Sequence, residues 1–385
     1  MKISVIYNDR FPSNIAHGVY LAKLCSSLSD AGAEVELVVP KRFNEVRGDP
    51  YNFYDVKENF KIVKIWSFDF IIFARLHPLF FYWLQYLNFY LFLFLYMLFR
   101  SRDRVVYTMD YMGPILKSLG YKVVFESHGG MVGGASFFLP LVLKSDLIVG
   151  TNSFITKRFI DLGYAKSKTL VAPNGVDTDK FWTGENVNDI RKKLGLPIDK
   201  KIISYVGKLK TAGRGKGVEE LIEAVIQVIS ERPDAYLMIV GVNEDEKREL
   251  EVILRHYGVR NYSYKLALQV SQSEVPKYLV ASDVLVMNYP AKEHYAYFMS
   301  PMKMFEYMAS GRPIVSTDLP SIREVLNTEN SILVEPENPE GLSRGILMAL
   351  NDLTLANKLA IRAREDVKEY SWDKRAKKIL NFISP

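Results

Sequence analysis

The segment KIISYVGKLKTAGRGKGVEELIEAVIQVISERPDAYLMIVG, residues 201–241, decides the fold class. It holds two apolar, β-branched runs, 201–207 and 235–241. Between them lie a basic, glycine-containing loop and a stretch, 217–231, whose apolar residues recur at helical spacing. A strand, a helix and a second strand in this order form a unit with parallel strands. Helices cover both faces of such a sheet, so its strands are continuously apolar.

The same alternation occurs along the rest of the chain. Three further runs follow this unit, at 283–288, 312–317 and 331–335, and seven precede it, at 2–7, 34–39, 61–66, 104–108, 122–126, 146–150 and 168–172. The sequence therefore predicts an α/β fold with two doubly wound, Rossmann-like domains that face each other across a cleft. We place the first domain at 1–172 and the second at 173–370. An amphipathic helix at 371–385 is expected to pack back on the first.

Composition restricts the class of protein. A chain of 385 residues, 48% hydrophobic and 24% charged, is expected to fold as more than one globular domain. Cys25 is the only cysteine, which excludes an intrachain disulfide and a cysteine-based metal site and favours a reducing compartment. The start, MKISVIYN, lacks the long apolar core of a secretion signal and is interpreted as a first strand. We expect a cytoplasmic protein.

The positive charge lies in the first half. Residues 1–172 hold 20 Lys and Arg against 14 Asp and Glu, a net of +6, which equals the net charge of the whole chain. This excess is interpreted either as a solvated surface or as attraction to an anionic surface such as a membrane leaflet.

Two loops of the first half carry candidate residues. Gly18 follows the first strand, where it either serves turn geometry or lets a ligand approach the backbone. His128 follows the fifth strand, in FESHGGMVGG. An imidazole there is interpreted either as a structural cap or as a donor to a sugar hydroxyl or a developing oxyanion.

A third loop lies in the second half and is basic. Lys208, Lys210, Arg214 and Lys216 precede the helix at 217–231. Cations beside a helix N-terminus favour a pyrophosphate, although an ordinary solvated loop is the alternative. The loop is not a Walker motif, because glycine follows Lys216.

The segment SPMKMFEYMASG, residues 300–311, predicts a short helix with a free N-terminus. Ser300 is expected at the N-cap, Pro301 at the first helical position, and Gly311 at the left-handed stop.

This helix has a predicted ligand. Its first amides, from Met302 on, can point at phosphate, and Glu306, one turn further, can accept hydrogen bonds from a ribose diol. The alternative for Glu306 is a surface ion pair with Lys303 at i, i+3.

Several segments together resemble a known family. SPMKMFEYMASGRPIVSTDLPSIREVL is similar to the donor-site signature of the retaining glycosyltransferases of group 1, also called family 4, which have the two-domain GT-B fold. PNGVDTDKF resembles the interdomain motif of that family, VGKLK with KGVEELIEA its pyrophosphate-binding basic pair, and HGVYLAKL its N-terminal glycine loop. These matches follow the order of the family over nearly the whole chain.

The resemblance implies roles for single residues. Lys208 and Lys216 would neutralise the donor pyrophosphate, Glu306 would bind the ribose hydroxyls, and His128 would lie near the reacting sugar. Gly18 would lie under the donor phosphates or near the acceptor. The amides around Ser300, Pro301 and Met302 would contact phosphate or sugar.

The chain departs from the family signature at Phe298. The family has a second glutamate at this position, eight residues before Glu306, so the sugar contact of that carboxylate must be made otherwise. Glu293, His294 or main-chain groups are the alternatives. Leu268 also replaces a usual glycine, near the segment 265–272 expected to distinguish uracil from guanine.

The resemblance also implies a mechanism. A hexosyl unit of a UDP- or GDP-sugar is expected to move, with retention, to the hydroxyl of a lipid-linked or glycan acceptor by front-face attack. The nucleotide-sugar is a substrate, so neither a cofactor nor a metal is expected, and no nucleic-acid partner either. The DTD at 177–179 is interpreted as a turn rather than as a metal motif. Two rivals remain: a nucleotide-sugar 2-epimerase of the same fold, and a non-catalytic sugar-nucleotide or membrane-binding module.

The apolar segment 79–99, LFFYWLQYLNFYLFLFLYMLF, is long enough to span a membrane. Predicted strands of one sheet flank it, however, so we expect a helix in the membrane interface instead, with Phe80, Phe81 and Leu91 in contact with lipid. Arg100 and Arg102 are expected at headgroup level. A buried core helix and a dimer contact are the alternatives. The enzyme would then be peripheral on the inner face of the cytoplasmic membrane.

Overall fold

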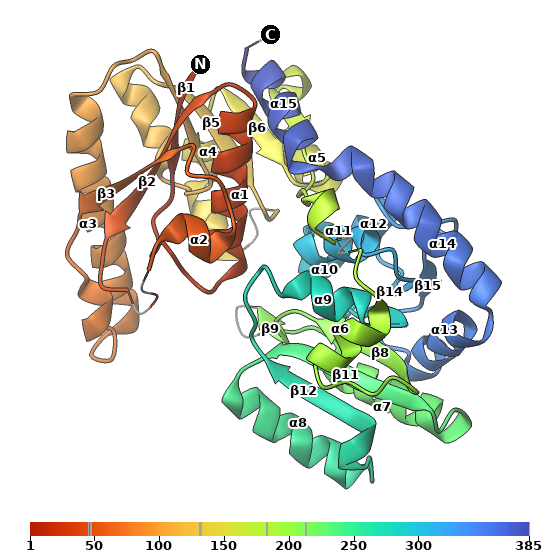
Figure 1. The fold of residues 1–385 in the computed structure, drawn as a ribbon. Coiled ribbons are helices and arrows are strands. Elements are labelled where there is room, and N and C mark those ends of the chain that lie inside the picture. Colours follow the sequence, from red (N-terminus) through yellow and green to blue (C-terminus); the bar gives the residue numbers. More distant parts are fainter. Residues whose placement is uncertain (45, 47, 131–132, 182–183, 212–213, 385) are drawn as a thin grey trace. The chain divides into compact units, whose positions relative to one another are not determined.

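The structure is a computed structural model that describes residues 1–385 except 45, 47, 131–132, 182–183, 212–213 and 385, with no side chains described at 133–135, 211 and 214. The chain divides into two compact units. The first comprises Met1–Pro173 and Trp372–Pro385, and the second comprises Asn174–Ser371. Figure 1 shows both chain termini in the first unit.

The first unit contains a seven-stranded, entirely parallel sheet in the order β3-β2-β1-β4-β5-β6-β7. All seven apolar runs that the sequence predicts form its strands: β1 Lys2–Ile6, β2 Glu34–Lys41, β3 Lys61–Trp66, β4 Arg104–Thr108, β5 Lys122–Ser127, β6 Leu147–Gly150 and β7 Thr169–Val171. The connecting helices are α1 Ala16–Asp30, α2 Pro50–Tyr54, α3 Pro78–Leu98, α4 Leu139–Val142 and α5 Ser153–Asp161, and the unit also contains α15 Trp372–Ile383, which contacts α1.

The second unit contains a six-stranded parallel sheet in the order β12-β11-β8-β13-β14-β15. Its strands are β8 Lys201–Val206, β11 Ala235–Val242, β12 Tyr264–Leu268, β13 Val284–Met287, β14 Ile314–Thr317 and β15 Ile332–Val334. Its helices are α6 Val187–Lys193, α7 Val218–Glu231, α8 Glu244–His256, α9 Val275–Val280, α10 Glu293–Tyr297, α11 Met302–Ala309, α12 Pro320–Arg323, α13 Pro339–Asn351 and α14 Leu353–Asp366. A hairpin of β9 Lys210–Thr211 and β10 Arg214–Gly215 follows β8.

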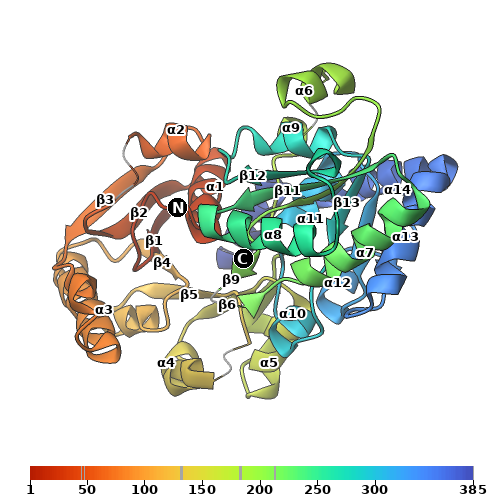
Figure 2. The same cartoon turned by 90° about the horizontal axis from the view of Figure 1, so that it is seen from below.

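Two hydrophobic clusters form the core of the second unit. In one cluster, α7 packs beside α13 (Figure 2), and the buried residues of both helices contact Ile203 and Val286 of the sheet. The other holds the buried face of α11, including Met304 and Phe305. Helices thus cover a parallel sheet through two separate cores, which confirms the predicted α/β class with Rossmann-like domains.

The strand orders mark where a ligand is expected. In the first sheet β1 pairs with β2 on one side and β4 on the other, and in the second β8 pairs with β11 and β13. The connections from β1 and β8 therefore leave at the points where each strand order reverses, which is where open α/β sheets bind ligands. The candidate residues of both units lie at the carboxyl ends of these strands or of other strands in the same sheets.

Candidate functional site

The basic loop after β8 begins with a glycine that no other residue can replace without strain. Gly207 has φ +135°, outside the range of side-chain-bearing residues, and its amide donates to Val240 O at 2.8 Å. A Cβ on Gly241 would come within 2.9 Å of the Gly207 backbone. The two glycines let the strand ends pack closely, and they set the direction in which Lys208 leaves the sheet.

The loop ends at a second glycine, which is fixed against β13. Gly217, with φ +71°, is the N-cap of α7, and its carbonyl accepts a 2.7 Å hydrogen bond from Asn288 Nδ2. A Cβ at Gly217 would lie 2.5 Å from that nitrogen. Lys216 is therefore held directly before the N-terminus of α7, the strand-to-helix position that the sequence predicts.

The lysines of this loop differ in their surroundings. Burial, together with the nearby Lys208 cation, lowers the pKa of Lys216 to about 8, and Glu246 opposes the shift. Lys210 Nζ instead lies 3.7 Å from Glu249, and the side chain of Arg214 lies outside the described residues. The structure thus brings Lys208 and Lys216 together and assigns Lys210 to another partner.

The N-terminus of α11 corrects the predicted cap. The helix begins at Met302 with Pro301, extended at φ −72° and ψ 126°, in the N-cap position, so Ser300 is not the N-cap and Pro301 is not the first helical residue. Ser300 is occupied elsewhere: its Oγ accepts from the Asn174 amide at 3.2 Å, and its carbonyl accepts from Asn174 Nδ2 at 2.5 Å. Gly311, with φ +67°, confirms the predicted left-handed stop. Because no side chain caps α11, its first amides are open to an anion.

Lys303 also belongs to this site, although the sequence suggested it only as a surface partner of Glu306. Its side chain is only 9% exposed, and Nζ is buried with no hydrogen-bond partner among the described residues. Nζ lies 3.7 Å from the ring centroid of Tyr205 and 5.1 Å from that of Tyr289. The predicted alternative, a surface ion pair between Lys303 and Glu306, is wrong, because Lys303 is not at the surface.

Burial dominates the electrostatics of Lys303. Loss of solvent and the neighbouring Lys216 cation hold its pKa well below 10.5, and Glu306 opposes this only partly. Cation–π attraction to tyrosine contributes about 2 kcal/mol at a desolvated site. The loss of hydration on burial outweighs this attraction, since the pKa of Lys303 stays below its ordinary value. The rings therefore shelter the amine but do not replace its lost hydration.

Glu306 is oriented by a residue from another loop. Gln272, between β12 and α9, donates through Nε2 to Glu306 Oε1 at 3.0 Å. The carboxylate is therefore tied to the segment in which the sequence places recognition of the base. Gln272 could not be assigned this contact from sequence, because 34 residues separate the two.

Phe298, which stands where the family has a glutamate, is part of the hydrophobic core. Phe298 is 8% exposed and ends α10. Of the alternatives for its lost carboxylate, Glu293 is exposed and His294 is half-buried, both on α10. Their roles toward a sugar remain predictions.

The first unit contains a buried carboxylate at the end of β5. Glu126 is fully buried, and Arg375 of α15 lies 2.6 Å away, from Nη2 to Oε1. Tyr20 and Tyr107 also donate to this carboxylate. Burial alone would raise the pKa of Glu126, but Arg375, His128 and Tyr107 bring it down to about 2.

His128 lies directly beside this carboxylate. It follows the last residue of β5, as predicted, and its Nε2 lies 2.9 Å from Glu126 Oε1. His17 was not predicted from the sequence; its ring centroid lies 5.2 Å from that of His128. Burial and the nearby His128 lower the pKa of His17 to about 4, so it is neutral at pH 7.

Gly18 has a packing role. It lies within the first turn of α1, which begins at Ala16. A Cβ at this position would collide with Tyr54 Oη and with Ser13. The contact with donor or acceptor expected for Gly18 remains a prediction.

A pocket of about 390 Å³ is lined by Lys216, Lys210 and Lys292, but glutamates outnumber these cations, which does not suit a diphosphate: Glu219, Glu220, Glu246, Glu249 and Glu337. Within the described part of the chain, no group of three or more His, Cys, Asp and Glu residues is placed to hold a metal ion.

The exterior of the first unit presents an apolar helix face. Among the described residues, α3 is the one helix long and apolar enough to cross a membrane by length and composition, and 22% of its most apolar window is buried. Its inner stripe, Phe89, Tyr90, Leu93 and Met97, packs on the sheet. Because β3 and β4, on either side of α3, belong to one sheet, α3 is a crossover helix of this fold.

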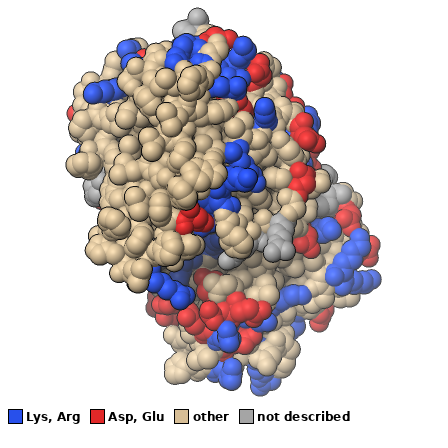
Figure 3. All heavy atoms as spheres, turned by 90° about the vertical axis from the view of Figure 1, so that its left-hand side faces the viewer, with Lys and Arg blue, Asp and Glu red and all other residues tan. Residues whose placement is uncertain are grey.

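The two polar residues of α3 point inward. Gln85 Oε1 accepts from the amides of Phe70 and Ile71, and Asn88 Oδ1 accepts from Phe68 N and Ser67 Oγ. The outer face is apolar and exposed, and Figure 3 shows a broad surface of this unit with few charged groups. Its exposed members include Leu79, Phe80, Tyr82, Trp83, Leu87, Leu91, Leu95, Leu98 and Phe99, whereas Phe81 is half-buried.

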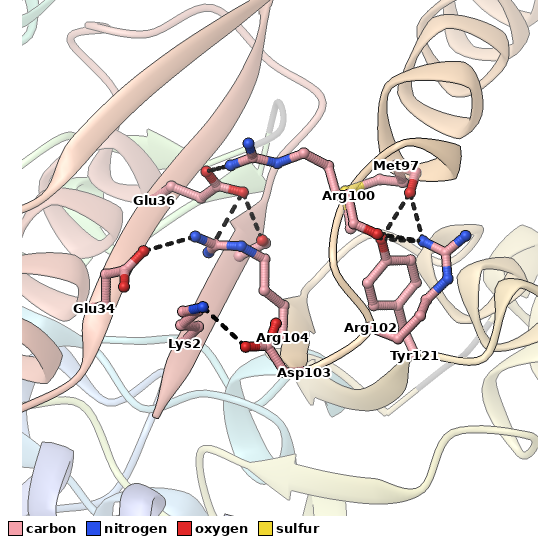
Figure 4. A network of polar contacts seen from close by, with 10 residues as sticks. Lys2, Glu34, Glu36, Met97, Arg100, Arg102, Asp103, Arg104 and Tyr121 are labelled. Atoms are coloured by element: carbon pink, nitrogen blue, oxygen red, sulfur yellow. Dashed lines mark hydrogen bonds and ion pairs between the residues drawn. The ribbon is translucent and has the colours of Figure 1, made fainter.

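The arginines after α3 make contacts within the unit. Arg100 Nη2 lies 2.6 Å from Glu36 Oε2, and Arg102 donates to the Met97 carbonyl near the end of the helix (Figure 4). Arg102 also donates to the carbonyl of Leu98. These contacts fasten the end of α3 to the unit, and the predicted contact of both arginines with headgroups remains a prediction.

The fold and this arrangement of residues define the class. Two Rossmann-like units match solved GT-B structures over the whole chain; HepE of Anabaena in complex with UDP-glucose superposes with a TM-score of 0.74 at 16% identity, over 100% of this chain and 99% of that one. Family models described as Glycosyltransferase Family 4 and as Glycosyl transferases group 1 match residues 17–180 and 200–352. The chain belongs to this glycosyltransferase family.

Named relatives share part of the chain. The D-inositol 3-phosphate glycosyltransferase of Corynebacterium urealyticum is 25% identical over 251 residues, 61% of this chain and 55% of that protein. The GDP-mannose-dependent monoacylated alpha-(1-6)-phosphatidylinositol monomannoside mannosyltransferase of Corynebacterium glutamicum is 26% identical over 277 residues, 68% of this chain and 70% of that protein. The matches to the first curated relatives cover 55% to 63% of the relatives' own length.

Proposed function

We propose that this chain is a retaining glycosyltransferase that moves a hexosyl unit from a UDP- or GDP-sugar to an acceptor hydroxyl. One observation carries the proposal: α11, whose N-terminus no side chain caps, bears both Lys303 and Glu306. Lys216 lies close enough to Lys303 to lower the pKa of that lysine. Half-buried lysines and a buried amine beside a helix N-terminus favour the binding of an anion. A nucleoside diphosphate supplies that anion, and its ribose supplies hydroxyls for Glu306.

The proposed chemistry follows from these charges. As the bond between the anomeric carbon and the diphosphate breaks, negative charge grows on the leaving oxygen, and Lys208, Lys216 and the amides of α11 stabilise it. The acceptor hydroxyl attacks from the face that the diphosphate leaves, and the departing phosphate takes its proton. His128 orients a sugar hydroxyl.

The acceptor is proposed to be a lipid-linked or cell-envelope glycan, met at the inner surface of the cytoplasmic membrane. The support is α3, whose polar residues point inward while its leucines and aromatics are exposed. A helix of this kind lies in a bilayer interface, where tyrosine and tryptophan are favoured. The net charge of +6 on residues 1–172 complements anionic lipid. We therefore assign this face to an anionic bilayer rather than to a second copy.

A donor panel tests the proposed activity. Thermal shift with UDP- and GDP-sugars is expected to identify one stabilising donor, and turnover of that donor with glycan and lipid-linked acceptors is expected to yield nucleoside diphosphate and a glycoside. An epimerised sugar formed without acceptor would instead establish a 2-epimerase. Donor binding without turnover across the acceptor panel would favour a binding module. Inverted stereochemistry at the anomeric carbon would rule out the retaining course.

A further inference from the structure

Lys303 is in an unusual position for a lysine. It stands in the first turn of α11, beneath two tyrosine rings, and its Nζ lies 3.7 Å from the place where a Cβ on Gly207 would be. Gly207 bears no side chain, so the amine faces the backbone that leads into Lys208. A buried amine with no described hydrogen-bond partner beside a second lysine is costly unless a ligand uses it.

We propose that Lys303 is a third cation of the diphosphate site, and that it takes up one proton from solvent when a nucleoside diphosphate binds. This inference rests on the proposed function. The free amine lies sheltered between Tyr205 and Tyr289, and the incoming phosphate oxygens accept hydrogen bonds from the ammonium that forms. The proton remains on Nζ while the nucleotide is bound and returns to solvent on its release.

The charges around Lys303 favour this sequence. In the free protein, burial and the Lys216 cation disfavour the ammonium, so the pKa of Lys303 lies well below 10.5. A bound diphosphate reverses the sign of the local field and raises that pKa. The groups that act on Lys303 are Lys216 of the basic loop, Glu306 of α11, and the rings of Tyr205 in β8 and Tyr289 after β13. Lys208 and Glu246 act in turn on Lys216.

Titration calorimetry with UDP and with GDP on the full chain tests the inference. At pH 8, apparent binding enthalpies in HEPES and in Tris, whose ionisation enthalpies differ, give the protons taken up per nucleotide. We expect Lys303→Met to take up fewer protons than the wild type and to bind about 10–100-fold more weakly. Lys23→Met removes another buried lysine, in the first unit, whose Nζ donates to Asp55 O. It is the matched control and is expected to keep both wild-type values.

Lys303→Arg covers the case in which the methionine variant does not fold. Arginine keeps its charge throughout, so this variant is expected to bind nucleotide while showing the same reduced proton uptake. Proton uptake equal to that of the wild type in either folded variant would overturn the inference. If the wild type binds neither UDP nor GDP, the proposed donor class itself fails, and the inference with it.

Discussion

Arg375 and Glu126 form a buried ion pair, 2.6 Å from Nη2 to Oε1, between the C-terminal helix and the fifth strand of the first unit. The same carboxylate oxygen lies 2.9 Å from His128 Nε2. Arg375 therefore acts on His128 through Glu126, as a positioning residue. The last helix of the chain supplies a charge on which the predicted active-site histidine depends.

Removing Arg375 alone is expected to be severe. Arg375→Met leaves Glu126 charged and buried, and we expect a loss of about 3–5 kcal/mol in the free energy of unfolding, measured with urea. The double variant Glu126→Gln with Arg375→Met buries no charge and should regain most of that stability. Lys377→Met, which breaks an exposed pair with Asp373 on the same helix, is expected to cost at most about 1 kcal/mol. Additive losses in the double variant would contradict the coupling.

The pair also predicts an acid-sensitive component of stability. The pKa of Glu126 is about 2 in the folded protein, below its ordinary value of 4.5. A depressed carboxyl pKa contributes stability that is complete above the unfolded pKa and is lost as pH falls. Between pH 4.5 and 2 the wild type should therefore lose more stability than the double variant, in urea unfolding at each pH. Parallel curves would show that Glu126 does not titrate in this way.

Nucleotide affinity is expected to fall in mild alkali through Lys216. Its pKa is about 8 in the free protein and should rise when a phosphate binds, so this lysine binds nucleotide as a cation at low pH and must take up a proton at high pH. Through Lys216, affinity for UDP or GDP should therefore fall above pH 8 by up to about a further tenfold per pH unit, in addition to the decline that proton uptake by Lys303 causes at lower pH. Lys216→Arg should remove this added decline. An equally steep decline in that variant would assign it to another group.

Glu306 and Gln272 are expected to act together on the donor. Glu306→Ala should weaken nucleotide binding by about 10–100-fold, because it removes a charged acceptor of the ribose hydroxyls. Gln272→Ala should have a smaller effect in the same direction, since it frees the carboxylate to turn. Glu231→Ala, at the exposed end of α7, is the control. A donor whose thermal shift is the same for wild type and Glu306→Ala would disprove this site.

The outer face of α3 is expected to bind anionic vesicles. Leu87, Leu91 and Leu95 are about half exposed, so changing all three to serine should cost little folding stability but should abolish sedimentation with vesicles of anionic phospholipid. Ile361→Ser on α14 removes an equally exposed residue of the second unit and should sediment as the wild type does. Phe81 is a poorer probe than predicted, because it is half-buried near Phe73. A wild type that ignores such vesicles, yet self-associates through this face, would favour the dimer contact.

Much of the fold could be predicted because it rests on local patterns. Continuous β-branched runs identified all seven strands of the first sheet and five of the six in the second. The strand β12, in YKLAL, was missed because a lysine breaks its apolar run; the Nζ of this Lys265 donates to Leu194 O. The N-cap of α11 was also misplaced. Serine is a good cap by local rules, but here a hydrogen bond from Asn174, 126 residues away, holds Ser300 outside the helix.

The sequence by itself determined the fold class, the family resemblance and the stop at Gly311, because strand periodicity, motif order and a left-handed glycine are properties of neighbouring residues. Only the tertiary structure decided which polar groups are buried and what they face. It placed Lys303 beneath two tyrosines, turned Gln85 and Asn88 inward, and brought Arg375 to Glu126 across 249 residues. Burial and distance control the energy of a charge, and both are set by packing between segments that are remote in the chain.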